Sequence, residues 1–178
     1  MLTTINEPWI MLIGGGYFDL EDPELSEFDI HDIAHALSLI CRYTGHCRQF
    51  YSVAQHSVLV SLTVPQEHAR AGLLHDAAEA FIGDVSKPLK NLLPDYQSIE
   101  ARVERTVFER FGLPAKLPPC VEEADRILLR TEQRDLTAAG SHRWSRTAGI
   151  LPLAERIVPL GPLEAKREFL NRYFALTR

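Results

Sequence analysis

Three segments of this sequence each place one potential metal ligand on a mostly apolar helical stripe. Residues spaced i, i+3, i+4 and i+7 lie on one face of a helix. The stripes span residues 53–60, 71–78 and 121–128, and their imidazoles and carboxylate come from His56, His75 and Asp125. One inward histidine is most often a hydrogen-bonded core residue, because burying a polar group without a partner costs about 1–3 kcal/mol. Three such residues on separate helices favour a shared divalent cation that satisfies all of them.

Asp76 directly follows His75 and adds a second carboxylate. Neighbouring residues on a helix diverge by about 100°, and an ion in the angle between them can meet both side chains. Two imidazoles and two carboxylates suit Mn, Co, Fe, Ni or Zn. The sequence therefore predicts one divalent metal ion, which would lower the pKa of a water and make hydroxide available near neutral pH.

Two acidic residues that follow the His-Asp pair are candidate catalytic groups. Glu79 lies at i+4 from His75 and i+3 from Asp76, so we expect it on the same side of the helix. There it could orient the water or move its proton, although a surface glutamate is the alternative. Asp84 follows Gly83 in a predicted loop and is either an acid near a leaving group or a turn residue.

Basic side chains near these motifs could bind a phosphate. Arginine offers a planar fork to phosphate oxygens, and lysine offers a point charge. The candidate substrate-binding residues are Arg42, His46, Arg48, Lys87 and Lys90. For the two arginines, the alternative is an exposed surface position.

A second His-Asp pair, His31-Asp32, is followed by His35 and resembles the H-E-x-x-H pattern of zinc peptidases. An aspartate is one methylene shorter than the glutamate base of that pattern. Both histidines also lie on the polar side of a predicted helix whose apolar side is already defined. We therefore expect a solvated or cleft-facing surface here.

Helical periodicity covers most of the chain and predicts an all-α fold. The predicted helices span about 29–43, 52–64, 66–81, 95–111, 118–137 and 162–176. Apolar runs flank three glycines and predict a short N-terminal hairpin within residues 9–20. We expect a single domain, 1–178, with a hairpin and acidic loop at 1–28, a metal-binding helical core at 29–138, and a C-terminal loop and helix at 139–178.

The ordered set of His, His-Asp and distant Asp resembles the signature of the HD-domain metal-dependent phosphohydrolases. The matching segments read VAQHS, LLHDAAEAFIGD and EEADR, so the ligand positions are His56, His75, Asp76 and Asp125. The block H-D-A-A-E-A-x-x-G-D is similar to the small 5′-deoxynucleotidase-like branch. The resemblance covers roughly residues 30–138.

This resemblance implies a compact HD-domain helical bundle that holds one divalent ion and hydrolyses a phosphate ester. It implies that Glu79 assists the attacking water and that Asp84 lies near the departing oxygen. An arginine ahead of the first ligand histidine binds phosphate in that branch, and both Arg42 and Arg48 fit. Histidines that two-metal relatives carry between the His-Asp pair and the last Asp are absent from this sequence.

We therefore expect a metal-dependent phosphohydrolase of small nucleotides, which removes the 5′-phosphate of deoxynucleoside monophosphates by metal-hydroxide attack. One alternative is a dNTP (dATP-type) triphospho- or pyrophosphohydrolase. Another is a non-catalytic nucleotide-sensing HD module.

Composition agrees with a small-molecule enzyme in the cytoplasm. The 178 residues are 46% apolar, and the net charge of −5 disfavours binding of a nucleic-acid polymer. The acidic excess lies in residues 1–41, which hold eight acids and no Lys or Arg, whereas the remainder has a net charge of +3. We expect no membrane span, because no apolar stretch approaches 20 residues. A homodimer is possible.

Overall fold

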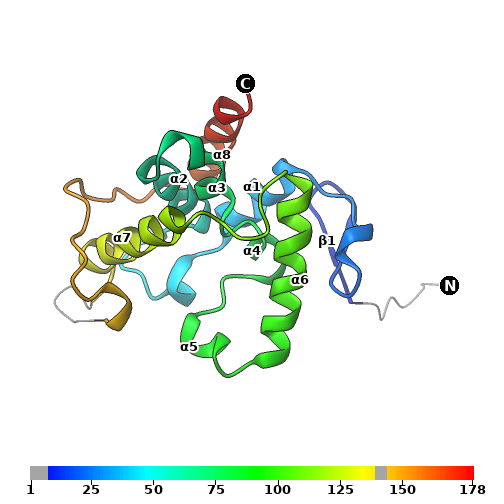
Figure 1. The fold of residues 1–178 in the computed structure, drawn as a ribbon, viewed down its shortest axis with the longest axis horizontal. Helices are drawn as coiled ribbons and strands as arrows, with labels where there is room; N and C mark the ends of the chain where they lie inside the picture. Colours follow the sequence, from blue (N-terminus) through cyan, green and yellow to red (C-terminus); the bar gives the residue numbers. More distant parts are fainter. Residues whose placement is uncertain (1–7, 139–143) are drawn as a thin grey trace.

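The computed structural model describes residues 8–138 and 144–178, and within them the chain is mostly helical, which confirms the all-α prediction. In Figure 1, α6 and α7 lie on opposite sides of the molecule, with α2, α3 and α8 between them. The helices are α1 (Ile30–Leu39), α2 (Val53–Thr63), α3 (Ala69–Leu74), α4 (Glu79–Ile82), α5 (Lys87–Lys90), α6 (Pro94–Arg110), α7 (Pro119–Leu136) and α8 (Pro162–Leu176). Short 3-10 turns occur at Pro23–Leu25, Arg42–Gly45, Gln66–His68 and Ser145–Thr147.

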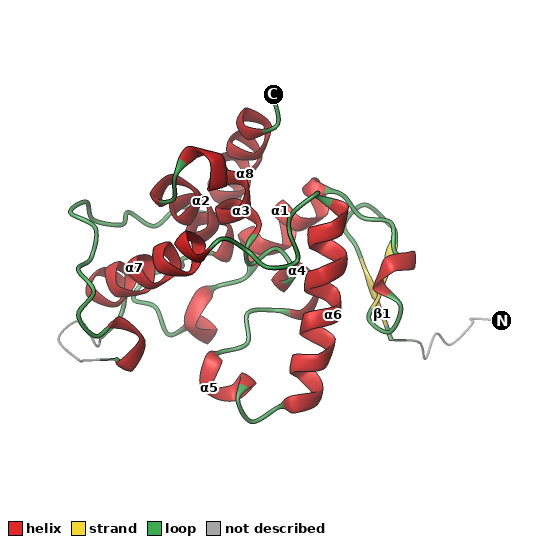
Figure 2. Cartoon of the chain, viewed as in Figure 1, coloured by secondary structure: helices red, strands yellow, loops and turns green. Residues whose placement is uncertain are grey.

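The predicted N-terminal hairpin is confirmed and is the one sheet among the described residues (Figure 2). Strand β1 (Trp9–Met11) pairs antiparallel with β2 (Tyr17–Asp19). Phe18 of β2 is fully buried, and its ring stacks on Phe81 of α4 with centroids 3.9 Å apart. The hairpin therefore anchors the helix on which Glu79 lies.

Helix α1 begins at a capping box that employs the aspartate of the second His-Asp pair. The Asp29 side chain accepts hydrogen bonds from the first-turn amides, and Asp32 accepts one from the Asp29 amide at 3.1 Å. Asp32 also accepts the amide of Gly14 at 3.1 Å, so it ties the hairpin turn to α1. The carboxylate of this pair thus has a structural role in helix initiation.

The helix predicted over 29–43 ends earlier, at Leu39. The chain then becomes extended, and the Arg42 amide donates to the Tyr51 carbonyl at 2.9 Å. The turn that follows places Tyr43 in left-handed backbone at φ 57°. Pairing with the segment ahead of α2 therefore replaces the last helical turn that local periodicity predicts.

The helix predicted over 66–81 is not continuous, because it divides into α3 and α4 at the His-Asp pair. Between them the amides bond three residues back: Ala77 to Leu74 at 3.1 Å, and Glu79 to Asp76 at 3.0 Å. Such i→i−3 bonds wind the chain more tightly than an α-helix. The predicted loop beyond Gly83 contains the short helix α5, which periodicity did not predict.

Close packing of α2 on α3 sets the separation of the two stripe histidines. The contact occurs at Gly72, where an added Cβ would lie 3.1 Å from the Ser61 Cα and 3.1 Å from a Val64 methyl carbon. His56 lies on α2, and His75 directly follows α3. A side chain at position 72 would therefore separate the elements that carry both imidazoles.

The C-terminal part of the chain packs onto this helical core. Helix α8 packs against α1 and α2 through the fully buried Ala165 and Phe169. Ahead of it, the amide of Ile157 donates to Asp135 at 3.0 Å, and Arg156 pairs with the same carboxylate at 3.0 Å. The segment before α8 is therefore fastened to the end of α7.

A membrane-crossing helix would need more length and more apolar character than any helix among residues 8–138 and 144–178 has.

We expect Gly72→Ala to lower the free energy of unfolding by about 1–2 kcal/mol. Overpacking costs about 1–3 kcal/mol, which exceeds the stabilisation of up to about 1 kcal/mol that alanine gains over glycine in a helix. Urea denaturation measures the change, and Gly161→Ala is the control because a Cβ there meets nothing within 4 Å. Equal stability of the two variants would contradict the close-packing account.

We expect Asp135→Asn to lose about 1–3 kcal/mol at pH 7, because its carboxylate is nearly buried among charged donors. Hydrogen bonds from Arg134 hold the pKa of Asp135 below its ordinary value. Its stabilisation is therefore present above the unfolded-state pKa of about 3.9 and lost as the pH falls through the folded-state pKa. Denaturation at several pH values should show the difference from wild type shrinking below about pH 4. A constant difference down to pH 2 would contradict this assignment.

Candidate metal centre

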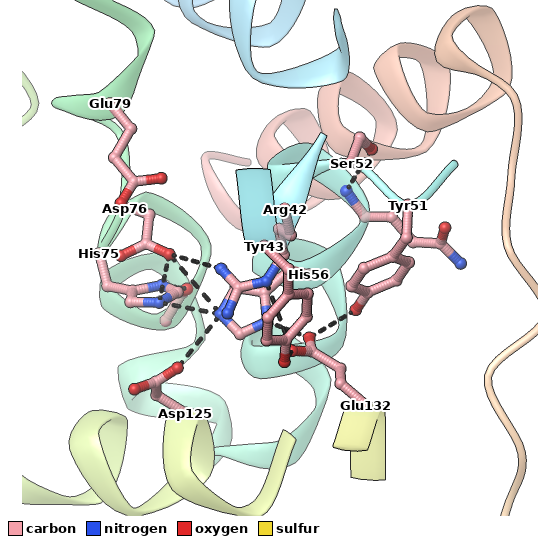
Figure 3. A network of polar contacts seen from close by, with 12 residues as sticks. Arg42, Tyr43, Tyr51, Ser52, His56, His75, Asp76, Glu79, Asp125 and Glu132 are labelled. Carbon is pink, nitrogen blue, oxygen red and sulfur yellow. Dashed lines mark hydrogen bonds and ion pairs between the residues drawn. The ribbon is translucent and has the colours of Figure 1, made fainter. Parts of the chain in front are cut away.

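Three of the predicted ligands converge on one point between α2, α7 and the end of α3 (Figure 3). The Nε2 atom of His56 lies 3.3 Å from Nε2 of His75 and 3.4 Å from Oδ1 of Asp125. Each of the three residues offers a ligand atom within 4.8 Å of the other two. Imidazole nitrogens and a carboxylate oxygen at this spacing could hold a metal ion.

Asp76 brings its carboxylate to the same point. Its Oδ2 lies 3.2 Å from Nε2 of His75 and 3.6 Å from Nε2 of His56. The tight turn that ends α3 carries both His75 and Asp76, so adjacent residues face one centre. All four sequence-predicted ligands thus lie together.

Each imidazole presents Nε2 to the centre and is held through its other nitrogen. Nδ1 of His75 donates to the Gly72 carbonyl at 2.8 Å, and Nδ1 of His56 lies 2.6 Å from Oε1 of Glu132. Histidines that bind metals usually donate their second N–H to a carbonyl or carboxylate in this way. The orientation of both rings therefore suits metal binding.

Glu132 is a site residue that the sequence analysis missed. It is fully buried on α7, two helical turns after Asp125. Besides His56, its oxygens accept the Tyr51 hydroxyl at 2.9 Å and the Tyr43 hydroxyl at 2.5 Å. The signal was available, because Glu132 lies at i+4 from Leu128 and extends the stripe of Asp125.

The centre is an electrostatic network of opposite charges. Burial alone would raise the pKa of Asp76, but His75, His56 and Arg42 hold it well below its usual range. Burial would likewise raise the pKa of Glu132, and Arg42 and His56 lower it. Both carboxyl groups are therefore ionised at neutral pH.

His56 responds to the same charges in the opposite sense. Burial and Arg42 lower its pKa, but Glu132 and a hydrogen bond to Asp125 raise the pKa to about 9. A metal ion that binds Nε2 must replace the proton held there.

Glu79 lies beside the centre in a pocket of about 380 Å³ that His75 and Asp76 also line. The Glu79 side chain is nearly buried, and its Oε2 has no hydrogen-bond partner among the described residues. Burial raises the pKa of Glu79 well above its ordinary value, and the negative charges of Asp76 and Asp84 add to that effect. The neutral form of this carboxyl is therefore favoured more than that of an exposed glutamate.

Asp84 is half-buried beyond Gly83, and burial raises the pKa of its carboxyl. The positive charge of Arg42 opposes that rise, and the negative charge of Asp76 reinforces it. Asp84 therefore shares the electrostatic environment of the centre.

The predicted phosphate-binding residues divide into two groups. Arg42 is mostly buried in the centre, with Nη1 3.4 Å from Oδ2 of Asp76, and Lys87 and Lys90 line the pocket beside Glu79. His46 and Arg48 are exposed, and neither side chain makes a hydrogen bond or ion pair with another described residue. The structure thus gathers Arg42 and the two lysines, but not His46 or Arg48, around the centre.

Arg146 is a second residue that the sequence analysis missed. It lies in the turn Ser145–Thr147, and its Nη2 is 3.1 Å from Oδ2 of Asp125. The other oxygen of Asp125 faces His56, so the carboxylate lies between the arginine and the centre. No helical periodicity marks Arg146, because it reaches the site from a loop.

A larger, more open hollow of about 550 Å³ lies between the start of α7 and Gly149–Leu151. It is lined by none of the predicted site residues, so we assign it no part in the chemistry.

The chain is similar over nearly its whole length to two bacterial proteins whose names describe them as uncharacterized. It is 42% identical to YfdR of Escherichia coli (strain K12), over 93% of each chain. It is 32% identical to a protein of Rhodobacter capsulatus, over 96% of each chain. No family model matches the chain.

We expect Asp125→Ala to abolish stoichiometric metal binding. Loss of a residue that hydrogen-bonds to a metal ligand lowers metal affinity by about 10–100-fold. Loss of a ligand itself should lower the affinity further. Metal analysis after loading with Mn²⁺ and desalting measures the effect, with about one ion per chain expected for wild type. Glu123→Ala is the control, since Glu123 is an exposed acid on the same helix. Full metal content in Asp125→Ala would show that the ligand set is wrong.

Proposed function

The chain belongs to the family of YfdR of Escherichia coli, and we propose that it is a metal-dependent phosphohydrolase of the HD-domain type, acting on small nucleotides. The observation that carries the proposal is the cluster of His56, His75 and Asp125 beside the unpartnered carboxyl oxygen of Glu79. Asp76 joins it through its contacts with both histidines. A ligand centre next to a buried carboxyl is an arrangement suited to metal-assisted hydrolysis.

One divalent ion fits the donor set. Two imidazole nitrogens and two carboxylates suit Mn, Co, Fe, Ni or Zn better than Mg or Ca. Within residues 8–138 and 144–178, the structure contains one group of three or more His, Cys, Asp or Glu at metal-binding distance. When bound, the ion would lower the pKa of a water and polarise a phosphoryl oxygen.

The two acids have distinct proposed roles. Glu79 orients the attacking water and takes its proton, because its burial leaves one oxygen unpartnered at the edge of the pocket. Asp84 gives a proton to the departing oxygen, and its raised pKa increases the fraction of the protonated form.

Arginine and lysine side chains supply the positive charge for the phosphoryl group. Arg42 lies against the ligand Asp76, and Arg146 lies against the ligand Asp125, so a guanidinium flanks each carboxylate. Lys90 lies in the pocket, 3.8 Å from Oε1 of Glu79. Preorganised donors of this kind stabilise the charge that develops on phosphoryl oxygens.

The proposed substrates are deoxynucleoside 5′-monophosphates, whose 5′-phosphate the enzyme would remove. The pocket volume of about 380 Å³ lies within the range that small ligands occupy. Glu100 and Glu104 of α6 line the same pocket, and Glu100 pairs with Lys90. A dNTP (dATP-type) triphospho- or pyrophosphohydrolase is the alternative, which the released product distinguishes.

A non-catalytic nucleotide-sensing module is the other alternative. Binding alone would not need the buried carboxyl of Glu79, whose unpartnered oxygen costs free energy. We therefore favour turnover.

Incubation of the purified protein with Mn²⁺ or Co²⁺ and a panel of dNMPs, NMPs, dNTPs and cyclic nucleotides tests the proposal. We expect free phosphate from dNMPs, and we expect Glu79→Gln to lower kcat by about 10²–10⁴-fold with metal content unchanged. Glu109→Gln is the control, because Glu109 is exposed on α6. Tripolyphosphate from dNTPs would support the second function instead. Nucleotide binding with no turnover would support the sensing module.

A further inference from the structure

We propose that Glu132 is a positioning residue that holds the metal ligand His56 and the phosphate-facing Arg42 in one arrangement. The inference rests on the proposed function, since it assigns this carboxylate a task in metal and phosphate binding. It starts from two contacts of the fully buried Glu132 carboxylate, one with His56 and one with Arg42.

The two oxygens of Glu132 serve different sides of the site. Oε1 lies 2.6 Å from Nδ1 of His56 and accepts the Tyr51 hydroxyl at 2.9 Å. Oε2 accepts the Tyr43 hydroxyl at 2.5 Å and lies 3.4 Å from Nε of Arg42. One carboxylate thus orients an imidazole through one oxygen and faces a guanidinium through the other (Figure 3).

Packing alone does not explain a charge at position 132. Glu132 and His56 are both fully buried, and removing such charges from water costs several kcal/mol per ion. Apolar residues of similar volume are often as stabilising as a buried ion pair. A role in orienting the site accounts for the carboxylate.

The backbone ahead of α2 is strained in the segment that reaches Glu132. Tyr43 and Thr44 both have left-handed conformations, with φ of 57° and 55°, although neither is glycine. Each such residue costs on the order of 1–3 kcal/mol and persists only where its surroundings hold it there. The turn brings the Tyr43 hydroxyl to Oε2 of Glu132, beside Arg42. The hydrogen bond from Tyr43 to Glu132 stabilises the turn.

The arrangement predicts that metal affinity and phosphate affinity depend on the same side chain. Glu132→Gln keeps the shape and one accepting oxygen, but it removes the charge that faces His56 and Arg42. We expect the affinity for Mn²⁺ to fall by about 10–100-fold, as for other hydrogen-bond partners of metal ligands. We also expect the inhibition constant of inorganic phosphate to rise.

Thr131→Val is the matched control. Thr131 is fully buried next to Glu132 and accepts the Leu153 amide at 3.0 Å, but it lies outside the cluster. Its loss should lower stability without changing Mn²⁺ affinity by more than about 3-fold. A purely structural role for Glu132 predicts that the two variants behave alike.

Two measurements on the full chain test the inference. Isothermal titration calorimetry gives the affinity for Mn²⁺ alone, and inhibition of dNMP hydrolysis by inorganic phosphate gives the phosphate affinity of the Mn²⁺-loaded protein. Weakened metal and phosphate binding in Glu132→Gln, with both retained in Thr131→Val, supports it. Wild-type affinities in a folded Glu132→Gln would overturn it and leave the proposed function standing. A wild-type protein that binds none of Mn²⁺, Co²⁺, Fe²⁺, Ni²⁺ and Zn²⁺ would overturn the proposed function, and the inference with it.

If Glu132→Gln does not fold, the double variant Tyr43→Phe/Tyr51→Phe takes its place. It removes two donors to the carboxylate and keeps the charge. A drop in Mn²⁺ affinity of about 10-fold supports the positioning role. Unchanged affinity would contradict it.

Discussion

One negative charge in the core, on Glu132, is the constraint around which the candidate metal centre is arranged. A fully buried carboxylate is tolerated only when donors and positive charges surround it, and here they come from the turn at Arg42–Gly45, from Tyr51 and from His56. These partners belong to segments that precede or form α2, whereas Glu132 lies on α7. Satisfying this carboxylate therefore docks α7 against α2, and the same docking brings Asp125 to His56.

The remaining candidate ligands are positioned by the close contact of α2 and α3. Without a side chain at Gly72, the two helices approach closely, and the Gly72 carbonyl accepts the Nδ1 proton of His75. The tight turn after α3 then directs His75 and Asp76 to the same point. The hairpin packs against α4 through the stacking of Phe18 on Phe81, and so supports Glu79 at the edge of the pocket. Packing, hydrogen bonding and charge thus agree in placing acids, imidazoles and arginines around one centre.

Helical periodicity predicted the fold class and the three stripe residues His56, His75 and Asp125, because a polar residue on an apolar stripe is visible in local sequence. Asp76 was predicted from its position directly after His75. The same reasoning missed features that depend on distant partners. The end of α1 at Leu39 and the strained Tyr43 follow from pairing with the segment before α2, which no local pattern encodes. The break after α3 occurs at the His-Asp pair, where no adjoining Gly or Pro marks it. Glu132 continued a visible stripe, but its role became evident only from its contacts with Tyr43, Tyr51 and Arg42 in the structure. Arg146 reaches Asp125 from a loop without periodicity.

The central claim is that two imidazoles and two carboxylates hold one ion, and X-ray absorption at the metal edge tests it most directly. Protein loaded with one equivalent of Zn²⁺ should show only nitrogen and oxygen neighbours at about 2.0–2.2 Å. Scattering from atoms beyond the first coordination shell should correspond to two imidazole rings in the wild type and to one imidazole ring in His75→Ala. A sulfur neighbour near about 2.3 Å would instead implicate a cysteine such as Cys41, Cys47 or Cys120. That result, or a spectrum of hydrated ion alone, would contradict the account.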